Sequence, residues 1–230
     1  MKSGRIMDLS YTKDDLAFRD EVQGFIREKF PPEIRAAVQR SSYVPKEHMV
    51  RWQKLLHDRG WIAPNWPQAH GGPGWSLTQK YIFDEELGLA GAPRLVVFGI
   101  NMCGPVLIGF GTEAQQKRFL PPMLSGEHIW CQGFSEPGAG SDLANQQTFA
   151  ERDGDNWVIN GHKVWTSLAH FAEWMILLCR TNKDDKYNGL SYFVVPIREN
   201  LDKGITVRPL IKMTGETGFN EVLFDSVVVD

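Results

Sequence analysis

The feature that most constrains the fold is a change in the spacing of apolar residues near residue 125. Before it, apolar side chains recur every three or four residues, as in the run from Leu16 to Ile26, which is the period of an amphipathic helix. After it, β-branched and aromatic residues form short runs separated by turn residues, which is typical of strands. The sequence therefore predicts an α+β multidomain chain: an all-α N-terminal domain at 8–126, followed by an antiparallel β-barrel or sandwich domain at 127–230.

Three pairs of polar residues mark helix starts in the first half. They are Thr12 with Asp15, Ser76 with Gln79, and Thr112 with Gln115. Each pair places a hydroxyl three residues before a carboxylate or amide, so that the two side chains can satisfy the free backbone donors of a first turn. The predicted helices lie near 12–29, 46–58, 76–90, 94–109 and 113–124. Pro31-Pro32 and the Pro- and Gly-rich segment 63–74 are predicted to lack regular structure.

The second half contains five clear β-rich runs. They are found at 157–159, 174–178, 191–195, 205–207 and 221–224. Between them, Asp153 to Asn156, Asn160-Gly161 and Asn188-Gly189 are predicted turns, because Asn, Asp and Gly accept the backbone angles of tight hairpins.

Composition excludes several classes of function. A net charge of −3 with no cluster of Lys and Arg argues against a nucleic-acid partner, because phosphate binding needs such a cluster. Cys103, Cys131 and Cys179 are too far apart for a zinc site and odd in number, so we expect buried free thiols. The six His residues show no paired metal-ligand spacing. No apolar run approaches roughly 18 residues, so we expect no membrane span and a cytoplasmic location.

The densest motif is the glycine-rich segment from Gln132 to Asp142, which reads QGFSEPGAGSD. It lacks the G-x-G-x-x-G order of a dinucleotide-binding turn and the Lys-Ser/Thr ending of a phosphate loop. Its free backbone N–H groups and two hydroxyls are suited to holding an anionic or polar ring edge. The alternative is an ordinary turn between strands.

A second motif, Asn160 to Ser167, is predicted to be a hairpin turn leading to a strand that presents Trp165 beside two hydroxyls. A lone tryptophan is usually part of a core. Taken with the glycine-rich segment, however, S-E-P-G-x-G-S-D followed by G-x-K-x-W-x-S resembles the middle β-domain of the acyl-CoA dehydrogenase family. The resemblance extends to Glu85-Glu86-Leu87, to the helix start after Gly111 and to the closing Phe224-Asp225-Ser226-Val227.

The resemblance implies that FAD binds against the β-domain. The residues that it assigns to the cofactor are Gln132, Phe134, Ser135, Gly138, Gly140, Ser141, Trp165, Thr166 and Ser167. Ser135 and nearby N–H groups would polarise the pyrimidine edge of the isoalloxazine, and Trp165 would pack on one face of the ring. The family more often reads W-I-T-N-G where this chain reads W-T-S-L-A, so either Ser167 or Thr166 would offer its hydroxyl to the hydride-accepting nitrogen.

The resemblance also assigns an acyl-CoA site. Ser141 would touch the pantetheine arm, and Arg94, Val96 and Gly99 would lie along the helix that lines the acyl pocket. Arg94 at a helix start suggests a carboxyl-tipped acyl chain, with a solvated surface arginine as the alternative. Gly99 would make room for a long or bulky chain, or else permit close helix packing.

The function implied is flavin-dependent α,β-dehydrogenation of an acyl-CoA thioester, with electron-transfer flavoprotein as acceptor and a dimeric or tetrameric homo-oligomer when full length. The family's catalytic base comes from a C-terminal helical domain. We expect that domain to be absent from these 230 residues, which contain no substitute, so this fragment is expected to be inactive. Asp84, Glu85 and Glu86 are predicted to form a solvated helix face. The alternatives are a non-catalytic flavin- or acyl-CoA-binding module, and oxidase- or desulfinase-type chemistry on the same fold.

Overall fold

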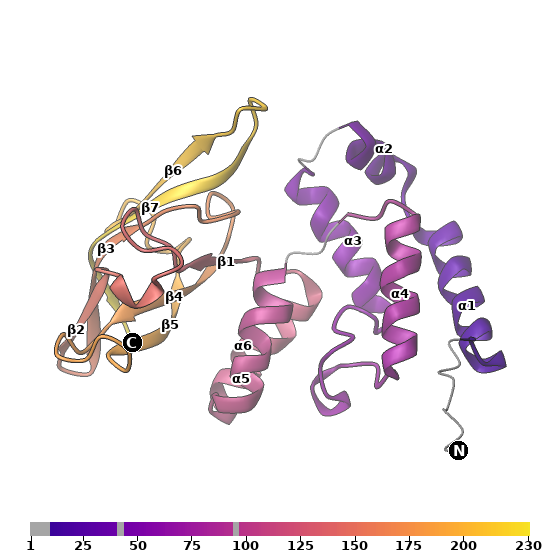
Figure 1. Ribbon diagram of the computed structural model, residues 1–230, viewed down its shortest axis with the longest axis horizontal. Coiled ribbons are helices and arrows are strands. Elements are labelled where there is room, and N and C mark those ends of the chain that lie inside the picture. Colours follow the sequence, from indigo (N-terminus) through magenta and orange to yellow (C-terminus); the bar gives the residue numbers. More distant parts are fainter. Residues whose placement is uncertain (1–9, 41–43, 94–96) are drawn as a thin grey trace, which may run out of the picture. The chain divides into compact units, whose positions relative to one another are not determined.

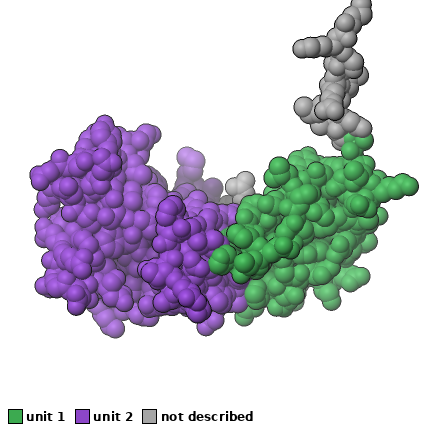
Figure 2. Space-filling view, turned by 90° about the horizontal axis from the view of Figure 1, so that it is seen from below, with its two compact units in different colours: residues 1–94 green, residues 95–230 purple. Residues whose placement is uncertain are grey.

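A computed structural model describes residues 10–40, 44–93 and 97–230. The chain forms two compact units, residues 1–94 and 95–230 (Figure 2). This division falls earlier in the chain than the change from helix to strand. The domain boundary between 126 and 127 therefore remains a prediction. None of the helices in the described ranges combines the length and apolar character that crossing a bilayer requires.

The first unit contains four α-helices among its described residues, and α1 packs beside α4 (Figure 1). Their bounds are α1 (Lys13–Lys29), α2 (Pro32–Arg40), α3 (Lys46–Asp58) and α4 (Leu77–Leu89), with the short 3-10 helix η1 (Gln68–His70). Phe18, Val22 and Ile26 are buried on α1 at four-residue spacing, which confirms the predicted helical period. The capping boxes at Thr12 and Ser76 are both formed.

Two predictions for this unit are wrong. Pro32 begins α2 rather than breaking the structure, because the first position of a helix needs no N–H donor and favours the backbone angle of proline. Glu86 is buried, at 7% exposure, instead of lying on a solvated face. Its carboxylate accepts a hydrogen bond from Gln23 at 3.1 Å and lies 3.5 Å from the guanidinium of Arg19, so α1 supplies the partners that make burial tolerable.

The helical part of the second unit is η2 (Phe98–Cys103), α5 (Gly104–Phe110) and α6 (Glu113–Ser125). The predicted continuous helix at 94–109 is replaced, over its described residues, by a π-helical turn that runs into α5. Pro105 accounts for this, because it has no N–H to donate to the carbonyl four residues earlier and its ring pushes that carbonyl away. The capping box at Thr112 is formed as predicted.

The described strands form a seven-stranded sheet in the order β1-β4-β2-β3-β7-β6, with β5 pairing to β4. Their bounds are β1 (Trp130–Gly133), β2 (Phe149–Asp153), β3 (Asn156–Lys163), β4 (Trp174–Arg180), β5 (Leu190–Pro196), β6 (Ile205–Ile211) and β7 (Thr217–Val229), with the 3-10 helix η3 (Leu143–Asn145). All five predicted β-rich runs lie in strands, and β1 and β2 complete the sheet. Figure 1 shows the long β6–β7 hairpin extending from it.

The predicted class, helices followed by a β-domain, is confirmed, but the sheet is mixed rather than purely antiparallel. β1 pairs with β4 in parallel over Trp130 to Gly133, and β2 meets the same strand in parallel at Phe149 and Arg180. β1 and β2 therefore follow one another along one edge of β4. The segment between them leaves that edge and returns to it, which makes 134–148 a loop held at both ends by the sheet.

Asn160-Gly161 is not the predicted hairpin turn. β3 continues through it, and the pairing with β7 shifts register between Ile159 and Gly161. A β-carbon at Gly161 would lie 2.6 Å from the α-carbon of Thr148, so glycine is needed here for close backbone approach. The Asn160 side chain accepts from the N–H of Ser226 at 2.8 Å. The pair thus forms a bulge within a strand.

The sheet buries an apolar core that includes Ile159, Met175, Val195, Val222 and Phe224. The three cysteines are free and buried, as predicted.

Candidate functional site

The glycine-rich loop is held in place by a buried lysine. Lys163, at the end of β3, is fully buried, and its ammonium donates to the carbonyl of Phe134 at 3.0 Å, to Glu136 at 2.9 Å and to the side chain of Gln146 at 2.8 Å. These three acceptors lie near the beginning and the end of the loop. One cation therefore ties both ends of the loop to β3.

Glu136 fixes the turn inside the loop. Its carboxylate also accepts from the backbone N–H groups of Gln147 at 2.6 Å and Thr148 at 2.8 Å. Burial alone would raise the pKa of Glu136, but these donors and Lys163 outweigh it and hold the pKa below its usual value. Burial lowers the pKa of Lys163, and the ion pair with Glu136 opposes that shift. Glu136 thus serves the geometry of the loop.

Arg180 clamps the loop from β4. Its backbone N–H donates to the carbonyl of Thr148 at 2.8 Å, and its guanidinium donates to the carbonyls of Gln146 and Ala144. The same guanidinium donates to the backbone carbonyl of Asp185 at 3.0 Å in the neighbouring turn. A planar group with five donors can hold several carbonyls at once, which makes the loop rigid.

The second motif, Asn160 to Ser167, is called the tryptophan segment below, and it lies directly beside the glycine-rich loop. The N–H of Val164 donates to the carbonyl of Ser135 at 2.9 Å, and Trp165 is the next residue along the chain. Trp165 has a φ of 61°, a left-handed conformation that is rare and strained for a bulky side chain. Its indole is 61% exposed and touches Phe219 edge-on, with ring centroids 6.0 Å apart. The two motifs identified in the sequence are therefore brought together.

The two candidate hydroxyls differ in position. Thr166 is 1% exposed, and its hydroxyl has no hydrogen-bond partner within the described part of the chain. Its backbone pairs with Asn220 of β7 in both directions, at 2.9 Å each. Ser167 is only partly buried. Of the two residues, Ser167 is the more exposed.

The remaining loop residues line an open surface. Gly138, Gly140 and Ser141 are exposed, and a β-carbon at either glycine would meet no atom within 4 Å. The side chain of Asn145 donates to the carbonyl of Gly138 at 3.2 Å and supports the turn from behind. Small residues with free space in front of them permit a ligand to approach the backbone closely.

Gln132 and Phe134 contact elements that flank the loop. The amide of Gln132 lies 3.5 Å from the sulfur of Met102 in η2, and the ring of Phe134 meets Tyr192 of β5 edge-on, with centroids 6.4 Å apart. Both side chains are partly buried.

Of the predicted acyl-pocket residues, Arg94 and Val96 lie outside the described residues. Gly99 is buried in η2, and a β-carbon on it would lie 2.8 Å from the indole of Trp130 and 2.9 Å from the side chain of Met123. This geometry favours close helix packing, the alternative reading of that glycine.

The packing of Gly99 leads to a prediction about stability. Gly99→Ala is expected to lower the free energy of unfolding by about 1–3 kcal/mol, because the added methyl overlaps two side chains that are themselves buried. Gly109→Ala in α5 is the matched control. A β-carbon there meets nothing within 4 Å, so alanine should raise stability by about 0.5–1 kcal/mol through its better helix propensity. Urea unfolding measures both, and equal effects at the two positions would contradict the packing explanation.

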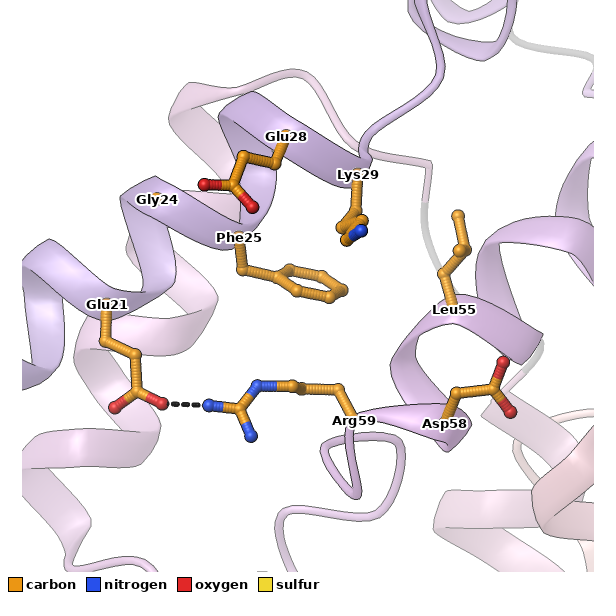
Figure 3. Close-up of a pocket in the computed structure, with 8 residues that line it drawn as sticks. All are labelled: Glu21, Gly24, Phe25, Glu28, Lys29, Leu55, Asp58 and Arg59. Atoms are coloured by element: carbon orange, nitrogen blue, oxygen red, sulfur yellow. Dashed lines mark hydrogen bonds and ion pairs between the residues drawn. The ribbon is translucent and has the colours of Figure 1, made fainter.

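A groove in the first unit has none of the predicted site residues in its lining. Figure 3 shows it between α1 and α3, with an opening of about 540 Å³. Phe25 and Leu55 provide its apolar lining, and an ion pair between Glu21 and Arg59 lies along one side. None of its lining residues belongs to the loop or the tryptophan segment.

Sequence reasoning did not identify Lys163, Gln146, Arg180 or Asn220 as residues that organise this site. A signal was present for two of them. Lys163 ends β3 and Asn220 lies within β7, each at a buried position in line with buried apolar residues, and a polar residue at such a position requires a specific partner. Their partners, however, lie far away in the sequence.

Comparison with known proteins agrees with this geometry. A family model for the acyl-CoA dehydrogenase N-terminal domain matches residues 12–127, and one for the middle domain matches residues 131–227. Acyl-CoA dehydrogenase IpdE1 of Mycobacterium tuberculosis is 44% identical over 220 residues, covering 93% of this chain and 56% of the relative. Its namesake in Mycolicibacterium smegmatis is 43% identical over 225 residues, covering 90% and 56%.

Solved structures give the same result. "Tcur3481-Tcur3483 steroid ACAD" matches with a TM-score of 0.84 and 33% identity, covering 97% of this chain and 57% of that one. The ChsE4-ChsE5 complex of Mycobacterium tuberculosis matches with a TM-score of 0.82 and 35% identity, covering 97% and 56%. The chain thus spans little more than half the length of these proteins. Because both domain models match and a relative covered over 93% of this chain is 44% identical, the chain belongs to the acyl-CoA dehydrogenase family.

Proposed function

We propose that these residues form the FAD-binding part of an enzyme that dehydrogenates an acyl-CoA thioester between its α and β carbons. The observation that carries the proposal is the contact between the two motifs, in which Val164 donates to Ser135 and Lys163 to Phe134. Bound FAD supplies the hydride acceptor for this reaction. Family membership supports the reaction class.

The residues present fit a flavin. Gly138 and Gly140 leave free space in front of exposed backbone, where a polar ligand edge can accept N–H donors. Trp165 presents an aromatic face to the outside instead of to the core. Gln132, Phe134, Ser135 and Ser141 complete the surface that we assign to the cofactor, with Ser141 shared with the pantetheine arm.

We assign the hydroxyl that contacts the reacting part of the flavin to Ser167. Thr166 is 1% exposed and its backbone is paired with β7, so its side chain points into the protein. Ser167 follows it in the chain and is partly exposed. A preorganised donor at this position stabilises the charge that the cofactor gains as it accepts hydride.

Glu136 is not the base that removes the α proton. Its carboxylate is 8% exposed and is engaged by Lys163 and two backbone N–H groups. A general base needs a free lone pair within reach of the substrate. We therefore assign Glu136 to the loop alone.

The substrate and partners are proposed more broadly. An acyl-CoA is the substrate, electron-transfer flavoprotein is the electron acceptor, and a dimer or tetramer is the expected assembly. One similar solved structure carries the description "steroid ACAD", which makes a bulky polycyclic acyl chain a candidate. The carboxyl-tipped chain proposed from Arg94 remains a second candidate, and Arg94→Ala would affect only that class of substrate.

The test is an FAD titration of the purified protein, followed by fluorescence quenching, with a matched pair of hydroxyl variants. Ser167→Ala is expected to weaken FAD binding by about two- to tenfold, since one hydrogen bond is lost. Thr166→Val should leave binding unchanged and keep or raise stability, because it removes a buried hydroxyl that lacks a partner. Absence of FAD binding by the wild type would overturn the proposal. Loss of binding in Thr166→Val alone would reverse the assignment of the two hydroxyls.

Reoxidation distinguishes the related chemistries. When the full-length enzyme is reduced by an acyl-CoA, the flavin of a dehydrogenase should react slowly with air and rapidly with an electron-transfer flavoprotein. Rapid reoxidation by oxygen would favour an oxidase instead.

A further inference from the structure

Asn220 occupies a position in β7 where an apolar residue is expected. Along the inward face of this strand it is followed by Val222 and Phe224, and all three are buried. Asn220 itself is 0% exposed. Burying an amide in an apolar row is unfavourable unless its hydrogen bonds are made. The contacts of Asn220 therefore indicate what the amide does there.

Asn220 of β7 fixes the backbone of the tryptophan segment at Thr166. Its backbone N–H and its side-chain amide both donate to the carbonyl of Thr166, at 2.9 and 2.8 Å, and its own carbonyl accepts from the N–H of Thr166 at 2.9 Å. Three hydrogen bonds thus converge on the residue that follows Trp165. Because these bonds fix the backbone of Thr166, that backbone cannot shift to relieve strain at Trp165.

The backbone near Thr166 is strained on both sides, and the hydrogen bonds to Asn220 help to keep it in that strained conformation. Trp165 has a φ of 61° and Leu168 a φ of 64°, so two side chains larger than glycine adopt the left-handed conformation within four residues. Such conformations persist only where surrounding contacts impose them. The contacts here are the bonds of Thr166 to Asn220 and the bond from the N–H of Leu168 to the carbonyl of Gly218 at 3.2 Å.

His170 fixes the orientation of the Asn220 amide. The amide nitrogen lies 3.2 Å from Nδ1 of His170, and because an amide nitrogen only donates, Nδ1 must be the unprotonated, accepting nitrogen. Burial lowers the pKa of His170, which keeps the ring neutral and this nitrogen free to accept. The two amide hydrogens are thus divided between Thr166 and His170.

We propose that Asn220 is a positioning residue for the cofactor: through Thr166 it holds the indole of Trp165 and the hydroxyl of Ser167 in the geometry that contacts the flavin, with His170 orienting its amide. This inference rests on the proposed function. It explains why a strand row that is otherwise apolar contains a buried amide. Asn220 touches no cofactor atom in this role and acts through the backbone of its neighbour.

Asn220→Asp is the sharpest test, since it preserves shape but replaces the donor by an oxygen that faces the Thr166 carbonyl. Hydrogen–deuterium exchange measures the amides of Val164, Thr166 and Leu168 without FAD, and the visible absorbance spectrum and FAD titration measure the site with it. In the variant we expect faster exchange at Thr166 and Leu168, an altered flavin spectrum and roughly tenfold weaker FAD binding.

Val222→Ala is the matched control, because it truncates a buried side chain in the same inward row of β7 and leaves the Asn220 amide and its hydrogen bonds to Thr166 in place. It should lower thermal stability yet leave the flavin spectrum and the exchange at Thr166 unchanged. His170→Phe is the second variant. It keeps all three hydrogen bonds between Asn220 and Thr166 and removes only the acceptor for the other amide hydrogen. Exchange, flavin spectrum and FAD affinity should therefore change in the same direction as in Asn220→Asp, but less.

The outcomes distinguish the proposed function, FAD binding, from the proposed positioning role of Asn220. A wild type that binds no FAD overturns the proposed function. A wild type that binds FAD, together with an Asn220→Asp protein of unchanged spectrum, affinity and exchange, overturns the positioning role alone. Equal flavin effects in Val222→Ala and Asn220→Asp would also overturn it, because general destabilisation would then account for both. If Asn220→Asp does not fold, unchanged exchange and spectrum in His170→Phe would have the same meaning.

Discussion

Lys163→Met is expected to lower the free energy of unfolding by about 3–5 kcal/mol, because it leaves a buried carboxylate without its cation. The ammonium of Lys163 is 0% exposed and contacts Glu136, Gln146 and the carbonyl of Phe134. All three acceptors lose a donor at once. Urea unfolding followed by circular dichroism measures the loss.

The same variant should also weaken FAD binding, because Lys163 fixes both ends of the loop that carries the proposed cofactor residues. The double variant Lys163→Met/Glu136→Gln is the control. It removes the unpaired charge while keeping an oxygen that can accept a backbone N–H, so it should recover part of the stability. FAD affinity should recover less than stability, since the tie between β3 and the loop remains broken. Full recovery of FAD affinity would show that the hydrogen bonds from Lys163 to the loop are not needed for cofactor binding.

Glu136 should make the free energy of unfolding depend on pH. Its folded-state pKa is held below the usual value, so its contribution to stability is present above the unfolded-state pKa and is lost as pH falls through the lowered folded-state pKa. In Lys163→Met the carboxyl lacks its cation and will take up a proton at higher pH. The stability difference between wild type and variant should therefore narrow in acid, and unfolding curves at a series of pH values will measure it.

Trp165→Gly is expected to separate binding from stability. Its indole is 61% exposed and its backbone is left-handed, so glycine relieves about 1–3 kcal/mol of strain while costing about 0.5–1 kcal/mol of backbone entropy. The free energy of unfolding should change little. FAD affinity, in contrast, should fall roughly five- to hundredfold, the usual effect of removing an aromatic ring that stacks on a base.

Phe110→Ala is the matched control for Trp165→Gly. Phe110 is 89% exposed and belongs to the same unit, but it lies in α5, away from the loop and the tryptophan segment. Its removal should change neither stability nor affinity by much. A Trp165→Gly protein that is strongly destabilised, or that binds FAD as tightly as the wild type, would contradict the assignment of the indole to the cofactor.

Much of the local structure could be predicted from the sequence. The three capping boxes at Thr12, Ser76 and Thr112 form as predicted, since their partners are three residues away. The strand runs were recognised from β-branched and aromatic residues, and the two motifs of the β-domain identified the family. Pro32 and Asn160-Gly161 show the limit of local rules, because each residue type fits more than one context. Proline both breaks helices and begins them, and Asn-Gly serves bulges as well as turns.

The sequence by itself determined the order of helix and strand, the helix starts and the family, because these depend on contacts within a few residues or on ordered motifs. Only the tertiary structure decided which side chains hold the site. Lys163 meets Glu136 across 27 residues and Asn220 meets Thr166 across 54. Such pairs exist only once β1 and β2 share the edge of β4 and β7 lies beside β3. Sheet register brings them together, and register is set by the packing of the whole unit, which no short stretch of sequence encodes.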